Sequence, residues 1–214
     1  MSLAVLPRLG STHLQDRAGV KAPKRRLHLG CGYNILKDWI NLDHYAGAGI
    51  DVVADLDQCN INPLPFENDS IDEFFAAHVF EHIRNPLPMM QELHRIARPG
   101  AKAIFVTPYG SSDDAFEDPT HVRQCFIHTF AYFSQPFLWR ADYGYRGDWE
   151  IDVLQLKIQR KRHFGKTTEQ MMNEVMSQRN VVLEMCAILH AIKPIRPPDK
   201  ELQKSTKVEF ILVD

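Results

Sequence analysis

Arg26-Leu27-His28-Leu29-Gly30-Cys31-Gly32-Tyr33-Asn34 is the stretch of sequence on which the prediction of the fold rests. Arg26, the end of a basic run, opens it, a short apolar strand follows, and a glycine-rich turn ends it. Because glycine has no Cβ atom, a backbone that contains it can approach a ligand closely. The order of these parts predicts a ligand held at the carboxyl end of the first strand of a parallel sheet.

Apolar strands and helical segments alternate along the chain. The expected strands are residues 27–29, 39–43, 50–55, 71–77, 103–106, 151–158 and 207–213. The expected helices are residues 35–38, 86–98 and 168–192, the second being ended by Pro99-Gly100. Such alternation favours a mostly parallel sheet covered on both faces. The last two strands are expected to pair antiparallel at one edge of that sheet.

The glycine turn does not match two well-known phosphate-binding patterns. A dinucleotide site needs Gly-x-Gly-x-x-Gly and an acid about 20 residues later, but Ile35 replaces the third glycine and Asp43 comes too early. A P-loop needs a following Gly-Lys-Ser/Thr, which is missing. S-adenosylmethionine has no pyrophosphate and needs a carboxylate for its ribose and a polar group for its adenine. Asp43 and Asp55 follow the second and third strands, where those contacts are required.

Residues from about 27 to 108 resemble the class I S-adenosylmethionine-dependent methyltransferases. Five motifs carry the resemblance in the right order: Leu27-His28-Leu29-Gly30-Cys31-Gly32, Trp39-Ile40-Asn41-Leu42-Asp43, Ala54-Asp55-Leu56, 64–72 and 92–100. The resemblance implies a three-layer α/β Rossmann-like fold with a mostly parallel seven-stranded sheet and an antiparallel edge strand. An N-terminal arm (1–24) would precede the methyltransferase domain (25–214), which would carry an aromatic-rich cap at about 108–149.

S-adenosyl-L-methionine is the cofactor that this resemblance implies. The residues expected to bind it are His28, Gly30, Cys31, Gly32, Asp43, His44, Asp55, Leu56 and His78. His28 departs from the family pattern, because many members carry an acid there that helps to hold the methionine ammonium.

His78-Val79-Phe80-Glu81-His82 matches the His-x-x-Glu-His signature of a zinc peptidase class. That chemistry needs both histidines on one helix face, whereas the pentad follows a strand and precedes the helix, which argues against a peptidase. A metal-dependent hydrolase is therefore only the rival function. The pentad also resembles the Glu-x-x-Glu-His of ubiquinone-type and small-RNA methyltransferases, which bind a divalent ion. Two interpretations stay open. One is a metal site formed by His78, Glu81, His82 and His121; in the other, Glu81 and His82 only form hydrogen bonds and no metal is bound. Three imidazoles with one carboxylate suit zinc, manganese or iron better than magnesium.

Glu81, His82 and His121 are the candidates for a general base, because carboxylates and imidazoles accept protons at neutral pH. The aromatic-rich segment after residue 108 is the expected acceptor wall, with Tyr109, His121 and Arg123 as its polar groups. The acceptor is expected to be a small molecule. Basic clusters at 21–26 and 160–166 keep nucleic acid as a minority interpretation. A module that binds the donor without catalysis is the second rival.

The composition is ordinary for a soluble protein, with 44% hydrophobic residues and a formal net charge of −2. No apolar run reaches the ~20 residues that span a bilayer, and residues 1–19 lack the plan of a signal peptide. Four cysteines without paired spacing indicate free thiols in a reducing compartment. A cytoplasmic location without membrane contact is therefore expected, while the oligomeric state is not specified.

Overall fold

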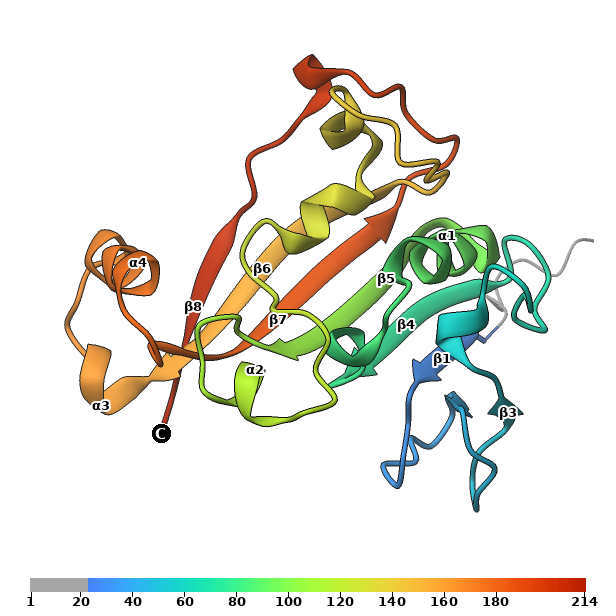
Figure 1. Cartoon of the computed structure of the whole chain (residues 1–214), viewed down its shortest axis with the longest axis horizontal. Coiled ribbons are helices and arrows are strands. Elements are labelled where there is room, and N and C mark those ends of the chain that lie inside the picture. The colour runs from blue at the N-terminus through green and yellow to red at the C-terminus, as the bar shows by residue number, and fades with distance from the viewer. Residues whose placement is uncertain (1–22) are drawn as a thin grey trace, which may run out of the picture.

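The computed structural model describes residues 23–214, and their strands form one eight-stranded sheet of order β3-β2-β1-β4-β5-β7-β6-β8 (Figure 1). The strands are β1 (Arg26–Leu29), β2 (Ile40–Asp43), β3 (Val52–Val53), β4 (Ile71–Ala77), β5 (Ala97–Pro108), β6 (Trp149–Gln159), β7 (Val182–Ala191) and β8 (Val208–Val213). Five neighbouring pairs are parallel, whereas β7 runs antiparallel to both β5 and β6. The expected N-terminal arm lies outside the described residues except for its last two positions.

The helices are short apart from α1 and α4. They are α1 (Pro86–Ile96), α2 (Asp114–Glu117), α3 (Arg160–His163) and α4 (Thr168–Ser177), with the 3-10 helices η1 (Leu56–Gln58), η2 (Phe80–His82), η3 (Thr129–Phe133), η4 (Gln135–Leu138) and η5 (Lys200–Leu202). Proline in the first turn of α1 fits its start, because the missing N–H has no partner there in any case. Thr167 and Gln170 form a capping box that fixes the start of α4. No helix among residues 23–214 is long and apolar enough to cross a membrane.

One face of the sheet carries the hydrophobic core. The helix α1 lies over this face (Figure 1). Phe74 and Phe105 belong to the buried core, and the ring of Phe105 stacks on that of Phe130 in η3. The ring of Phe80 joins the layers, since its centroid lies 5.9 Å from that of Phe105 and 4.7 Å from that of Phe130. The burial of these rings anchors the loop after β4, which forms part of the candidate site.

The opposite face, here called the open face, is lined by Phe75, Ile104, Val106, Cys186 and Ile188. Register places these residues side by side, because Ile104 pairs with both Phe75 and Ile188, and Val106 pairs with Cys186. All five are half-buried. The connections from β1 to β2 and from β2 to β3 contain turns but no helix.

The structure differs from the expected topology at its C-terminal end. Residues 168–192 were expected to form one helix, but α4 ends at Ser177 and β7 follows from Val182. Asn180, with φ of +57°, makes the turn between them. The sheet therefore has eight strands, its antiparallel strand β7 is interior, and the edge strand β8 runs parallel to β6. Buried and half-buried side chains alternate along most of β7, and this period of two is that of a strand and not of a helix.

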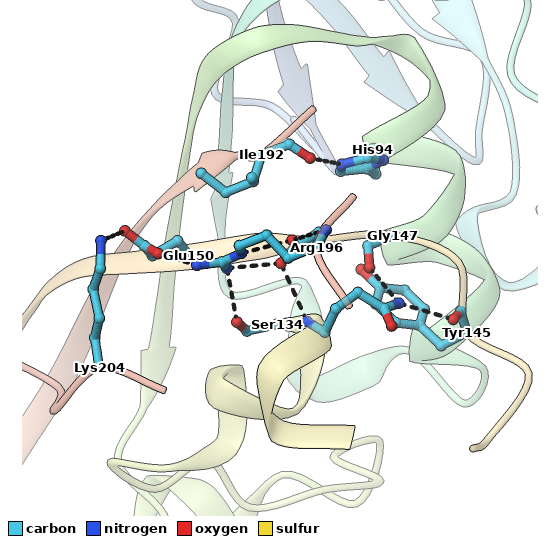
Figure 2. A network of polar contacts seen from close by, with 10 residues as sticks. His94, Ser134, Tyr145, Gly147, Glu150, Ile192, Arg196 and Lys204 are labelled. Atoms are coloured by element: carbon cyan, nitrogen blue, oxygen red, sulfur yellow. Dashed lines mark hydrogen bonds and ion pairs between the residues drawn. The ribbon is translucent and has the colours of Figure 1, made fainter. Parts of the chain in front are cut away.

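A buried ion network fixes the segment between β7 and β8 to the rest of the molecule (Figure 2). The Arg196 guanidinium donates to both carboxylate oxygens of Asp148 at 2.8 Å and to the Ser134 hydroxyl at 3.0 Å, and it also pairs with Glu150. Asp148 is fully buried. The network raises the pKa of Arg196, with hydrogen bonding to Asp148 as the largest cause. Segments far apart in the sequence are thereby held together at the start of β6.

Candidate functional site

The glycine turn after β1 adopts a conformation that favours glycine. Gly30 and Gly32 have φ angles of +57° and +51°, in the left-handed region. A Cβ atom on Gly30 would lie 2.5 Å from a methyl carbon of Val79, whereas one on Gly32 would meet no atom within 4 Å. Gly30 therefore lets the turn approach the loop after β4, while Gly32 leaves free space beside the turn.

The carboxylate of Asp43, at the end of β2, faces this turn. Its Oδ2 accepts a hydrogen bond from the Gly32 N–H at 2.8 Å, and its Oδ1 accepts one from the Tyr45 N–H at 3.3 Å. The Nδ1 atom of His44 lies 2.9 Å from the same Oδ1. Burial favours the protonated carboxyl, but these donors outweigh it and lower the pKa of Asp43. Asp43 is thus an ionised acceptor at neutral pH.

Asp55, which follows β3, caps η1 by accepting the N–H of Asp57 at 2.9 Å. Asp57 was not expected to take part. Its Oδ1 accepts the backbone N–H groups of Arg84 at 2.6 Å and Asn85 at 2.9 Å. These bonds fix η1 against the loop that precedes α1, and with it the position of Asp55.

A cavity of about 460 Å³ opens at the carboxyl ends of the first strands. Of the residues expected to bind the donor, those that line it are Gly30, Asp43, His44, Asp55, Leu56 and His78. Asp43 and Asp55 therefore face one space, whose volume suits a nucleoside-sized ligand. Gly32 contributes through its bond to Asp43.

His28 and Cys31 are placed differently from the expectation. Strand alternation turns His28 away from the side of Leu27 and Leu29, and its Nδ1 lies 3.2 Å from Oδ1 of Asn41. Burial lowers the pKa of His28, so the ring is neutral at neutral pH. Cys31 is buried beside the turn, and neither residue lines the cavity.

His78 lies between two carboxylates. Its Nε2 is 2.9 Å from Oε1 of Glu184 on β7, and its Nδ1 is 3.4 Å from Oε1 of Glu81. The contact with Glu81 is the largest cause that raises the pKa of His78 to about 9; burial opposes it and Glu184 adds to it. Glu184 also pairs with Lys157 on β6. The sequence did not indicate Glu184, because its strand was expected to be helical.

Glu81, His82 and His121 form the second part of the site. Each offers one potential ligand atom, and these atoms lie within 4.8 Å of one another. Glu81 is only 2% exposed, yet neither of its carboxylate oxygens has a hydrogen-bond partner, and the same holds for the buried Nδ1 of His121. The structure thus brings together three of the four expected metal ligands. His78 is not among these three; its Nδ1 pairs with Glu81 of the cluster and its Nε2 with Glu184.

The hydrogen bonds around Thr120 fix the tautomer of His82. The Thr120 hydroxyl lies 2.6 Å from Oδ1 of Asp118, to which it donates, and 2.9 Å from Nδ1 of His82. Since that hydroxyl has only one proton, it must accept from His82, and Nδ1 carries the proton of the neutral ring. The Nε2 atom of His82 is then left with a free lone pair, which can accept a proton or bind a metal.

A family model described as "Methyltransferase domain" matches residues 27–105. This span contains the glycine turn, Asp43 and Asp55 of the cavity lining, and the pair Glu81 and His82. Residues 27–105 therefore carry the methyltransferase domain that this family model describes. No curated protein matches the sequence.

Solved structures with the same fold are distant in sequence. A SAM-dependent methyltransferase from Archaeoglobus fulgidus has a TM-score of 0.52 at 14% identity, covering 79% of this chain and 87% of its own. A SAM-dependent methyltransferase of Thermotoga maritima, described as a possible histamine N-methyltransferase, has 0.51 at 13%, with 81% and 84% covered. The [4+2]-cyclase SpnF has 0.50 at 13%, with 81% and 75% covered. At such identities the likeness concerns the fold alone and says nothing of the acceptor.

Two of the three residues expected to reach the acceptor serve the loop instead. Arg123 turns inward, where its Nε donates to the Ile83 carbonyl at 3.0 Å and its guanidinium lies 5.4 Å from the Phe80 ring centroid. Tyr109 is buried, and burial raises its pKa. His121 remains in the cluster, beside Thr120, which lines the cavity. Packing of the loop, which no motif encodes, decides these orientations.

Proposed function

We propose that the protein transfers the methyl group of S-adenosylmethionine to an oxygen or nitrogen atom of a small-molecule acceptor. The observation that carries this proposal is the single cavity into which Asp43 and Asp55 both open, above the glycine turn. In this arrangement Asp43 accepts from the ribose hydroxyls, and Asp55 with the N–H of Leu56 recognises the adenine. The free space beside Gly32 leaves room for the methionine part of the donor.

Calorimetric titration with S-adenosylhomocysteine tests the donor site. A hydrogen bond to a charged group contributes about 1.5–3 kcal/mol, so Asp43→Ala and Asp55→Ala are each expected to weaken binding at least about tenfold. Asp152→Ala, at an exposed position of β6, is the matched control and should bind like the unaltered protein. If the unaltered protein does not bind the nucleoside at millimolar concentration, the proposed function is wrong.

His82 is the proposed general base. The sulfonium donor is already activated, so the reaction needs mainly proximity and orientation. The acceptor atom attacks the methyl carbon, the bond from carbon to sulfur breaks, and the proton of the acceptor passes to Nε2 of His82. Asp118 and Thr120 support this role, because they hold the other ring nitrogen in its protonated form. His82→Gln is expected to lower the turnover rate by 10²–10⁴-fold while the affinity for S-adenosylhomocysteine stays unchanged.

Metal assistance is the second candidate, favoured by the buried Glu81, whose oxygens accept no hydrogen bond and whose only ion pair is the 3.4 Å contact with Nδ1 of His78. A buried carboxylate with so few partners is costly, and a cation in contact with it would lower that cost. Glu81, His82 and His121 would hold the ion, which would lower the pKa of an acceptor hydroxyl. Calorimetry with Mn²⁺ and Zn²⁺ tests this arrangement: binding that is lost in His121→Ala supports the metal, and the absence of binding supports the metal-free base.

A small acceptor fits the charge distribution better than nucleic acid does. Arg160 in the basic run of α3 pairs with Asp214, and Lys166 pairs with Glu174, so part of that positive charge is neutralised. Incubation of a cell extract with labelled donor, followed by separation into metabolite and nucleic-acid fractions, tests this choice. Label is expected among the metabolites. If the protein binds the donor but no fraction is labelled, it is a non-catalytic binding module. If it does not bind the donor and has a hydrolytic activity that a chelator abolishes, it is a metal-dependent hydrolase.

A further inference from the structure

Two walls of the cavity come from separate parts of the chain. The first, here called the donor wall, consists of Asp55, Leu56 and Asp57 at the start of η1. The second, here called the base wall, consists of His82 and Ile83 at the end of η2. Each of these 3-10 helices has only three residues, so neither is held by a long ladder of helical hydrogen bonds. The position of one wall relative to the other therefore depends on tertiary contacts.

Asp57 forms a clamp between the two walls. Its Oδ1 atom accepts the backbone N–H groups of Arg84 at 2.6 Å and Asn85 at 2.9 Å, and the Asn85 side chain donates to the Asp57 carbonyl at 3.3 Å. These partners lie 27 and 28 positions apart in the sequence, so the clamp is a long-range contact, unlike the local cap that Asp55 supplies to η1. Hydrogen bonds to a charged group are among the stronger ones in proteins. The clamp thus ties the donor wall to the residues that directly follow the base wall.

The peptide group between Ile83 and Arg84 is held at both ends. Its N–H donates to Asp57, and its carbonyl accepts from Nε of Arg123 at 3.0 Å. Because the C=O and N–H of a trans peptide point in opposite directions, these two contacts fix the plane of the peptide. His82 is separated from this peptide by the backbone of Ile83 alone. The clamp therefore restricts the backbone from which the His82 side chain projects.

A continuous chain of hydrogen bonds runs from Asp55 to the same peptide. The Asp55 carboxylate accepts the N–H of Asp57 at 2.9 Å, and the Asp57 carboxylate accepts the N–H of Arg84. We propose that Asp57 is a positioning residue, which couples the binding of the donor adenine at Asp55 to the placement of His82 beside the acceptor. This inference rests on the proposed function and adds a physical link between donor and base. Such a coupling is reciprocal, so a change at either wall alters the other.

Hydrogen exchange at the amides of Arg84 and Asn85, followed by NMR, measures this coupling. Both residues are exposed, so Asp57 is the main protection of their N–H groups. Saturation with S-adenosylhomocysteine is expected to slow their exchange at least about fivefold in the unaltered protein. The slowing should persist in Asp57→Asn, whose amide oxygen still accepts both N–H groups, and should be absent in Asp57→Ala. The matched control is Asp199→Ala, which removes a carboxylate that accepts the Glu201 N–H at 3.0 Å in η5 and should leave the slowing unchanged.

The rate of methyl transfer at saturating donor separates positioning from donor affinity, because a high donor concentration compensates for weaker binding. With a cell extract as the source of acceptor, Asp57→Ala is expected to lower the initial rate per folded molecule at least about tenfold, whereas Asp57→Asn should stay within about threefold of the unaltered protein. Circular dichroism reports the folded fraction of each variant. A purely structural role of Asp57 would lower this fraction and leave the rate per folded molecule unchanged.

The outcomes distinguish the coupling from the proposed function. If the nucleoside binds but slows exchange at the two amides equally in all variants, or in none, the coupling is wrong and the donor site stands. Equal rates per folded molecule in Asp57→Ala and the unaltered protein would also overturn the coupling alone. If the unaltered protein does not bind the nucleoside, the proposed function and the coupling are both wrong.

Discussion

Substitution of Gly30 by alanine tests the physical reason for the glycine turn. At φ of +57° any residue with a Cβ atom costs about 1–2 kcal/mol. The new Cβ would also lie 2.5 Å from a methyl carbon of Val79, and such overpacking costs roughly 1–3 kcal/mol more. Gly30→Ala is therefore expected to lower the free energy of unfolding by about 2–5 kcal/mol. Gly32→Ala has a similar φ but free space, so it should lose only about 1–2 kcal/mol.

Urea unfolding followed by circular dichroism measures both losses. The decisive sample is the double variant Gly30→Ala, Val79→Ala, because truncation of Val79 removes the clash and leaves the backbone cost. A complete double-mutant cycle with Val79→Ala alone is expected to show a coupling of about 1–3 kcal/mol. Equal losses for Gly30→Ala and Gly32→Ala, or strict additivity of Gly30→Ala and Val79→Ala, would refute the reasoning.

Three further outcomes follow from the contacts. The pKa of His78 is raised from about 6.5 in the unfolded chain to about 9. The stabilisation by the charged ring is therefore complete below pH ~6.5 and is lost as the pH rises through about 9. Chemical denaturation between these pH values should show a declining free energy of unfolding, and His78→Gln should remove most of this decline. Arg196→Met leaves the buried Asp148 without its ion-pair partner and should lower the free energy of unfolding by about 3–5 kcal/mol. Arg179→Met, which breaks an exposed ion pair with Asp113, should lower it by at most about 1 kcal/mol. Similar losses in the two variants would contradict the role of burial. Trp149→Phe removes an indole N–H that donates to an α1 carbonyl at 3.0 Å, and thermal unfolding should show a loss of about 1–3 kcal/mol; an unchanged midpoint would contradict it.

The part of the fold that forms the cavity could be predicted from local sequence patterns. Gly30 and Gly32 after an apolar strand, with Asp43 and Asp55 at the ends of the next two strands, set the place of the cavity. These features are local, because the direction of a strand and the conformation of a turn depend mainly on nearby residues. The same locality explains why the helix after Asn85 and the strand from Ile71 to Ala77 were predicted at nearly their observed bounds.

Which side chains meet around His78, Glu81 and Arg123 depends on long-range contacts. Glu184 reaches His78 across 106 positions, and Val182–Ala191 is a strand because it lies between β5 and β6, although its residues also suit a helix. Arg123 turns inward because its Nε–H donates a hydrogen bond to the Ile83 carbonyl, a contact that no sequence spacing encodes. Such contacts join segments that are far apart along the chain, so they depend on how the sheet closes rather than on any local pattern.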